Sequence, residues 1–244
     1  MSVSAKAFAQ WLHSTAPGLT NAEVCRLAGI KRSTLAQQLV RGKVAMSTVV
    51  AVARALGQDV VGALSGFEKF ADLATGAAAP TADELISQVS DMDLLREILD
   101  RQARADAAPA PPAWELSTVP HRTSVRCWID AVGPGDLRQQ IAKNTAVAPQ
   151  NLSAQITANR LAPDIAIAAA RIAGVGLTNG LVVASLITPA EAGWAEGARA
   201  EALAALPSSA LVTLAAVRLE NLGRTLRRLD NDNEQSTALW ENLG

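Results

Sequence analysis

An internal repeat constrains the fold of this chain more than any other feature of its sequence. When the 244-residue sequence is shifted by 117 positions, Trp11–Leu64 aligns with Trp128–Leu181 without a gap. Identical residues recur across this alignment, and those of the first copy are Trp11, Pro17, Gly18, Leu35, Gln38, Ala45, Ala51, Ala53, Arg54, Gly57 and Leu64. Apolar residues also align, as at Val24 with Ile141. We therefore predict two structurally equivalent parts, the first repeat (11–64) and the second repeat (128–181).

Composition favours a helical protein. The chain is 49% apolar, has no tyrosine and three phenylalanines, and is rich in Ala, Leu and Val. No run of alternating β-branched or aromatic residues indicates a set of strands. We predict an all-α fold with an N-terminal domain at 1–75, a helix and linker at 76–120, a second domain at 121–190 and a C-terminal helical segment at 191–244.

Residues 19–43 predict two short helices that meet at Gly29. A helix end often needs a residue in the left-handed conformation, which glycine adopts without steric cost. The first helix should begin near Thr20 or Asn21. The second should begin near Ser33 or Thr34, whose hydroxyl groups can cap free backbone N–H groups.

The first repeat resembles a known DNA-binding family. The residues that carry the resemblance are "AEVCRLAGIKRSTLAQQLVRGK" followed by "STVVAVARALG". Over about 8–64 they are similar to the DNA-binding domain of the lambda-repressor and Cro-like (XRE-type) helix-turn-helix family. The resemblance implies that the 31–40 segment is a recognition helix in the major groove. The DNA-binding residues that it implies are Lys31, Arg32, Ser33, Thr34, Gln37, Arg41 and Lys43.

These residue types suit direct readout, since Arg can pair with guanine and Gln with adenine. The alternative is a surface helix whose charges are merely solvated.

The second repeat, "LRQQIAKNTAVAPQNLSAQITANR", resembles another helix-turn-helix of the same family. Ala146 replaces the turn glycine, and Pro149 stands in the first turn of the second helix, where its missing N–H costs little. The implied DNA-binding residues are Gln150, Asn151, Ser153, Thr157 and Arg160. Asn and Gln can pair with adenine. The alternative is a diverged copy that serves packing or protein binding.

Charge is divided between the segments although the whole chain carries only −1. Residues 1–75 carry a net +4 and 121–190 a net +3, whereas 76–120 carry −5 and 191–244 carry −3. This pattern favours two phosphate-facing modules joined by connectors that do not bind DNA.

The segment between the repeats predicts one amphipathic helix over 81–106. It opens with a capping box of Thr81 and Glu84. Its i,i+4 ion pairs would be Glu97 with Arg101 and Asp100 with Arg104. The following "ADAAPAPPAWELSTVP" is typical of a semi-extended linker.

The C-terminal segment predicts two helices broken at Pro207. The second has apolar residues in the a/d spacing of a packing seam. They are Val212, Ala215, Leu219, Leu222, Leu226 and Leu229. Packing against 191–206 and self-association into a homodimer are the two alternatives.

The sequence lacks the features of several other protein classes. We find no Ser/Lys pair of a self-cleaving repressor, no metal cluster and no phosphate-binding glycine loop, so we expect no enzyme activity, cofactor, metal or small-molecule substrate. Cys25 and Cys127 should be buried thiols in helices, and His13 and His121 are isolated. There is no apolar run of about 20 residues and no signal pattern. We expect a protein of the bacterial cytoplasm, on DNA and not in a membrane.

Taken together, these features predict a sequence-specific transcriptional repressor that binds double-stranded DNA. Two tandem copies without a protease domain resemble an immunity repressor of an actinobacterial temperate phage or prophage, which would maintain lysogeny by reading an asymmetric operator. One alternative is a host regulator or antitoxin that binds DNA through the N-terminal domain and a protein through the rest. Another is a protein-interaction adaptor.

Overall fold

The structure is a computed structural model that describes residues 2–106, 114–133 and 135–241. These residues are mostly helical, which confirms the prediction that the fold is mainly α-helical. Two compact units are present. Unit 1 comprises Met1–Gln88 and Thr118–Arg199, and unit 2 comprises Val89–Ser117 and Ala200–Gly244. Each unit is described by itself.

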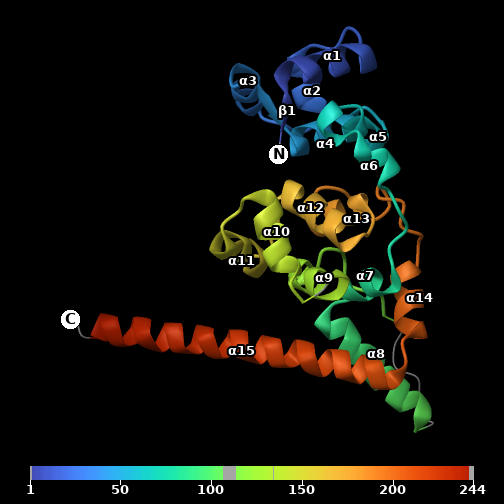
Figure 1. Ribbon diagram of the computed structural model, residues 1–244, viewed down its shortest axis with the longest axis vertical. Helices are drawn as coiled ribbons and strands as arrows, with labels where there is room; N and C mark the ends of the chain where they lie inside the picture. The colour runs from blue at the N-terminus through green and yellow to red at the C-terminus, as the bar shows by residue number, and fades with distance from the viewer. Residues whose placement is uncertain (1, 107–113, 134, 242–244) are drawn as a thin grey trace. The chain divides into compact units, whose positions relative to one another are not determined.

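The first part of unit 1, residues 2–75, contains a run of short helices and one pair of strands (Figure 1). The elements are β1 (Ser2–Ser4), α1 (Ala5–Thr15), α2 (Asn21–Leu27), α3 (Arg32–Val40), β2 (Lys43–Ala45), α4 (Met46–Ala55), α5 (Val60–Ser65), the 3-10 helix η1 (Glu68–Phe70) and α6 (Asp72–Thr75). The two strands are antiparallel, with Val3 opposite Val44. The sequence pattern does not predict them, because strands of three residues are too short to show a clear alternation.

The core of this part follows the apolar spacing of its helices. Val49, Val52 and Leu64 are fully buried, and Phe8, Val24 and Leu35 are each 1% exposed. The start of α2 is the predicted capping position, where Thr20 accepts from the Glu23 backbone and Glu23 accepts from that of Thr20. Apolar burial and this cap together position α2 and α3.

The second part of unit 1 repeats the same order of helices. Its elements are α7 (Ala82–Ser87), α9 (Ser124–Val132), α10 (Leu137–Thr145), α11 (Pro149–Thr157), α12 (Pro163–Ala173) and α13 (Leu177–Val183). Helix α11 begins and ends 117 residues after α3. The same shift places α4 on α12 and α5 on α13 to within one residue at each end.

Backbone details repeat as well. Gly29 has φ +65°, and its counterpart Ala146 has φ +54°. The side chain of Gln38 accepts a hydrogen bond from the Ala45 backbone N–H at 3.0 Å. Its counterpart Gln155 accepts from Ala162 at 2.9 Å. The aligned sequences therefore adopt the same local structure.

The left-handed turn gives a matched pair of stability predictions. Ala146→Gly should stabilise the protein by about 1 kcal/mol. The left-handed region costs an L-residue roughly 1–2 kcal/mol, and part of this gain is offset because glycine gives the unfolded chain more conformational freedom. Gly29→Ala should destabilise it by a similar amount. Urea unfolding followed by circular dichroism measures both changes, and a loss of stability in Ala146→Gly would contradict the strain at this turn.

Helix α7 belongs to the core of the second part of unit 1, although the sequence pattern assigns it to a connector. The Glu84 side chain is fully buried and accepts hydrogen bonds from Trp128 Nε1 and Asn179 Nδ2, both at 3.1 Å. Asn179 Oδ1 in turn accepts from Trp194 Nε1 at 2.8 Å. Both tryptophans and the carboxylate are thus satisfied by one network.

Unit 2 contains α8 (Asp91–Ala105), most of α14 (Ala198–Ala205) and α15 (Ser208–Glu241). The prediction of one helix over 81–106 is wrong, because α7 ends at Ser87 and α8 starts again at Asp91. Ser90 caps the new helix by accepting from the Asp93 N–H. The capping box of Thr81 and Glu84 is confirmed.

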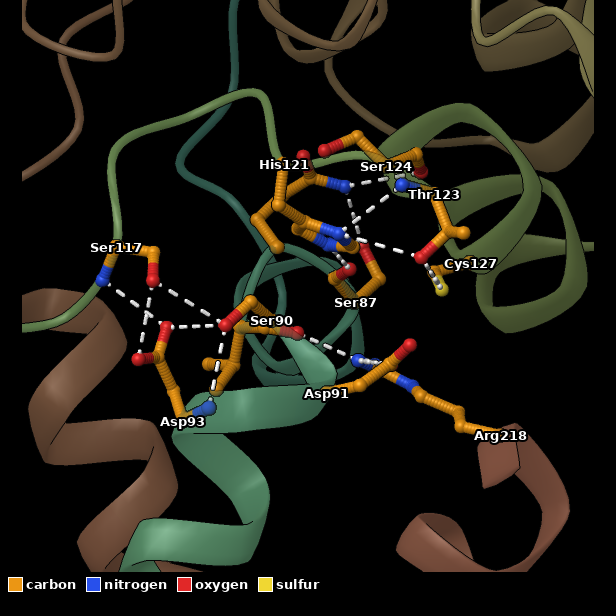
Figure 2. Close-up of polar contacts among 12 residues, drawn as sticks. Ser87, Ser90, Asp91, Asp93, Ser117, His121, Thr123, Ser124, Cys127 and Arg218 are labelled. Carbon is orange, nitrogen blue, oxygen red and sulfur yellow. Dashed lines mark hydrogen bonds and ion pairs between the residues drawn. The ribbon is translucent and has the colours of Figure 1, made fainter. Parts of the chain in front are cut away.

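The carboxylate of Asp93 organises the start of α8 (Figure 2). It accepts hydrogen bonds from the Ser90 hydroxyl at 2.7 Å and from the Ser117 N–H at 3.0 Å. Burial raises the pKa of Asp93, but the hydrogen bonds from Ser90 and Ser117 lower it more, so the pKa lies below its ordinary value of 3.8. The ionised form is therefore the one that the fold prefers.

This lowered pKa predicts acid sensitivity of unit 2. The stabilisation by Asp93 should be complete above the ordinary pKa of 3.8 and lost as the pH falls through the lower folded-state pKa. Asp93→Ala should cost about 1–3 kcal/mol at pH 7 and reduce the dependence on acid. Urea midpoints measured from pH 7 to pH 3 check this, with exposed Asp232 replaced by Ala as the control. Equal acid dependence in Asp93→Ala and the parent would contradict it.

The predicted ion pairs of α8 are half right. Arg101 Nε lies 2.7 Å from Glu97 Oε1, as expected. Asp100 instead accepts from Trp114 Nε1 at 2.6 Å, and Arg104 lies 3.4 Å from Glu97. The predicted pair of Asp100 with Arg104 is wrong because the indole N–H is a competing donor that lies outside the helix.

The C-terminal helices are broken at Pro207 as predicted, but the first of them is helical only over 198–205 rather than 191–206. Most of the apolar seam of the second helix is not buried. Leu211 and Ala215 are buried, and α15 packs against α8. Further along, Leu219, Leu226 and Leu229 are 40–46% exposed. Packing therefore accounts only for the first turns of α15. Residues 107–113 of the predicted linker lie outside the described residues.

Within the described ranges, no single helix is long and apolar enough to span a bilayer; α14 and the first part of α15 pass that test only as a pair bent by 108°.

Candidate nucleic-acid interface

Helix α3 exposes one polar face and is anchored by the other. Leu35 is 1% exposed, while the predicted DNA-binding residues on this helix and just before it are exposed. These are Lys31, Arg32, Ser33, Thr34 and Gln37. The apolar anchor therefore fixes the helix, and its polar side chains can meet a partner together.

The start of α3 differs from the prediction. Its first residue is Arg32, and Lys31 occupies the N-cap position without a side-chain hydrogen bond. Ser33 and Thr34 lie inside the first turn, so the prediction that one of them caps the helix is wrong. An extended Lys31 already brings the chain into the helix, which leaves both hydroxyl groups on the exposed surface.

Positive charge surrounds this face. Residues 24–58 contain no Asp or Glu. Arg41 and Lys43, which follow α3, are exposed. Among the residues that the structure describes, no ion pair involves Lys31, Arg32, Arg41 or Lys43. With no acidic residue in this stretch and none of these four cations in an ion pair within the described residues, the surface is suited to an anion.

Helix α11 presents the equivalent face of the second repeat. Leu152 and Ile156 anchor it and are 2% and 5% exposed. The residues predicted to bind DNA in this repeat are Gln150, Asn151, Ser153, Thr157 and Arg160. Gln150, Asn151, Ser153 and Thr157 are exposed, as is Arg160. Residues 137–163 also contain no Asp or Glu. The sequence thus identified two faces that the fold presents in the same way.

The two faces differ in chemistry. The 117-residue shift aligns Arg32 with Pro149 and Gln37 with Ala154. The same shift keeps a cation at Lys43 and Arg160. The first face is therefore cationic, whereas the second is built from amides and hydroxyl groups. A pocket of about 410 Å³ beside the second face is lined by residues that include Lys143, Val147, Leu152 and Ser153.

Sequence reasoning missed one exposed residue of α3. Val40 is 88% exposed at the end of this helix, an unusual place for a large apolar side chain. An apolar side chain of this kind suits contact with a thymine methyl group. The apolar type gave no signal of function, because such residues in a helix are usually part of the core.

The polar cluster around His121 in unit 1 is structural (Figure 2). His121 Nε2 lies 2.9 Å from the Ser87 carbonyl oxygen, to which it must donate. Its Nδ1 is then an acceptor for the Thr123 N–H at 3.3 Å. Cys127 donates to the Thr123 hydroxyl at 3.5 Å. Both ring nitrogens are engaged, so His121 holds a loop together and is not placed to activate the thiol.

Cys25 is buried as predicted, whereas Cys127 is only partly buried. Neither thiol forms a disulfide within the described residues. In the described part of the chain, no group of three His, Cys, Asp or Glu side chains is placed to hold a metal ion.

A scan against protein-family models, a search of curated proteins and a search of solved structures each found no match.

Proposed function

We propose that this protein is a sequence-specific transcriptional repressor that binds double-stranded DNA through two lambda-repressor-like helix-turn-helix domains. One observation carries the proposal. Helices α3 and α11 lie at the same place in two repeats of one fold, each anchored by buried leucine and each exposing polar side chains in a stretch without acidic residues.

Base readout would come from the exposed side chains of these two helices. Arg32 can donate two hydrogen bonds to guanine, and Gln37, Gln150 and Asn151 can each pair with adenine. Lys43 and Arg160 follow the helices and would contact phosphates, which position the protein without reading sequence. The two unlike faces would therefore read different bases, and the operator would be asymmetric.

Repression would follow from occupancy of an operator. The resemblance to the lambda-repressor family and the tandem arrangement support an immunity repressor of an actinobacterial temperate phage or prophage that maintains lysogeny. Such a protein works on DNA in the bacterial cytoplasm. It needs no catalytic residue, cofactor or metal.

Variants of the first face test the proposal on an operator selected from random double-stranded DNA. Arg32→Ala and Gln37→Ala should each weaken operator binding by about 1–3 kcal/mol, because each removes a base contact. Lys43→Ala should weaken operator and unrelated DNA alike and make binding less dependent on salt. Fluorescence anisotropy at several salt concentrations measures all three affinities.

Exposed Lys69→Ala is the matched control, because it removes a cation from η1, which contributes none of the proposed DNA-binding residues. It should retain operator binding and thermal stability. Failure to select any sequence, or unchanged operator affinity in both Arg32→Ala and Gln37→Ala, would overturn the proposal.

A second candidate function is a host regulator or antitoxin that binds DNA through the first repeat and a protein through α15. The observation that favours it is the exposure of Val212, Leu219, Leu226 and Leu229 on that helix. An exposed apolar stripe is typical of a surface that binds protein, including a second copy of the same chain. Light scattering of the purified protein distinguishes a homodimer from a monomer that awaits another partner.

A further inference from the structure

Reciprocal ion pairs join each repeat to the segment that follows the other repeat. In unit 1, Arg54 at the end of α4 holds Glu191 by two hydrogen bonds, Nε to Oε1 at 2.6 Å and Nη2 to Oε2 at 2.7 Å. Arg171, in the last turn of α12, pairs with Asp72. The repeat offset places Arg54 on Arg171. Each repeat therefore supplies the equivalent arginine to a carboxylate that follows the other.

The two carboxylates that accept from these arginines, Asp72 and Glu191, also lie at nearly equivalent positions of the repeat alignment. Asp72 lies in α6, which follows the first repeat, and the 117-residue shift places it at position 189, two residues before Glu191. In a two-fold interface, a residue of one subunit contacts a second residue of its partner, and the reverse contact also occurs. The crossed arginine pairs show this pattern within one chain.

Backbone contacts accompany the ion pairs. The Leu177 N–H donates to the Gly76 carbonyl oxygen at 2.8 Å. A Cβ at Gly76 would lie 2.5 Å from Leu177 Cδ1 and 2.9 Å from the Asp72 carbonyl oxygen, so no larger residue fits without movement. Arg54 Nη2 also donates to the Leu186 carbonyl oxygen at 3.2 Å. The contact is therefore more than a pair of surface charges.

The ion pairs are partly exposed and suit a contact that can open. The side chains of Arg54 and Glu191 are 44% and 22% exposed, and those of Arg171 and Asp72 are 56% and 47% exposed. The hydrogen bond from Arg54 lowers the pKa of Glu191 below its ordinary value. Pairs at this exposure are weakened by salt.

We propose that the two repeats dock on each other as an internal pseudo-dimer, in which Arg54 and Arg171 reach across to Glu191 and Asp72. The partner that this surface fits is the other repeat of the same chain. Where the proposed function holds, the docking gives one chain two reading faces at a defined separation, without a second protomer.

Distance measurement between spin labels tests the docking without DNA. The labels are attached at Gln10→Cys and Asn144→Cys, two exposed positions on α1 and α10, in full-length protein with Cys25→Ala and Cys127→Ser. We expect a single narrow distance distribution. The double variant Arg54→Glu/Arg171→Glu should broaden it, because both pairs then become repulsive, and added Glu191→Arg/Asp72→Arg should restore it.

Gly76→Val provides a second variant that leaves the charges unchanged and should also broaden the distribution. A broad distribution in the parent protein, or an unchanged one in both the charge-reversed protein and Gly76→Val, would overturn the docking. Neither result bears on the DNA-binding proposal, because operator selection and the operator affinities of Arg32→Ala and Gln37→Ala test that proposal separately.

Discussion

Trp128→Ala should lower the free energy of unfolding by about 3–5 kcal/mol, the typical cost of deleting a large aromatic side chain from a core. Trp128 is fully buried, and its indole N–H satisfies the buried carboxylate of Glu84. The substitution leaves a cavity and also removes a donor from that carboxylate. Urea unfolding followed by circular dichroism, with the slope compared between variants, measures the loss.

The repeat supplies the matched control. Trp11 occupies the equivalent position in the first repeat but is only partly buried, and its ring contacts Phe8 and Phe67 at centroid distances of 5.7 and 5.9 Å. Trp11→Ala should therefore cost clearly less. Trp128→Phe keeps most of the volume and should cost about 1–3 kcal/mol through the lost hydrogen bond. Equal losses in Trp11→Ala and Trp128→Ala would contradict the network at Glu84.

The parts of the fold that could be predicted are those set by local pattern. Apolar spacing and capping residues located α2, and the gapless alignment of the repeats located α11. Gln38 and Gln155 match in the sequence, and both make the same hydrogen bond to the backbone. Local signals of this kind depend on residues within a few turns, so the sequence displays them directly.

The features that the sequence did not predict depend on contacts between residues far apart in the chain, or on capping and hydrogen-bonding residues that override the helical pattern. Ser90 caps a new helix at a point where the apolar spacing runs on without a break, so the pattern alone hid the boundary. Asp100 bonds to Trp114 rather than Arg104. The role of α7 in a distant core depends on Glu84 meeting Asn179, a contact over 95 residues. Such contacts leave no local periodicity.

For the candidate site, the sequence predicted residues that the structure finds exposed, whereas their binding to DNA stays a prediction. The proposed DNA-binding residues are exposed on or beside α3 and α11, because a buried leucine at the same register sets the face of each helix. Val40 escaped notice because its apolar type suggested burial. The reciprocal pairs of Arg54 and Arg171 also escaped, since the repeat showed that the arginines match but not what they contact.

Arg32→Ala and Asn151→Ala should weaken operator binding at different bases. Each should cost about 1–3 kcal/mol, since each removes a base contact from a different face. Because the two side chains share no partner, the costs in the double variant should add to within about 0.5 kcal/mol. Anisotropy titrations of the two single variants and the double variant measure this directly. A double variant no weaker than Arg32→Ala would leave α11 without a reading role.

Base-by-base mapping of the operator with the parent protein and these two single variants tests the central proposal most directly. Every base pair is changed in turn, and the loss of affinity is compared between the three proteins. We predict a non-palindromic operator in which Arg32→Ala removes sensitivity in one part and Asn151→Ala removes it in the other. A palindromic operator, or an unchanged sensitivity map for Asn151→Ala, would contradict the reading of DNA by two unlike faces.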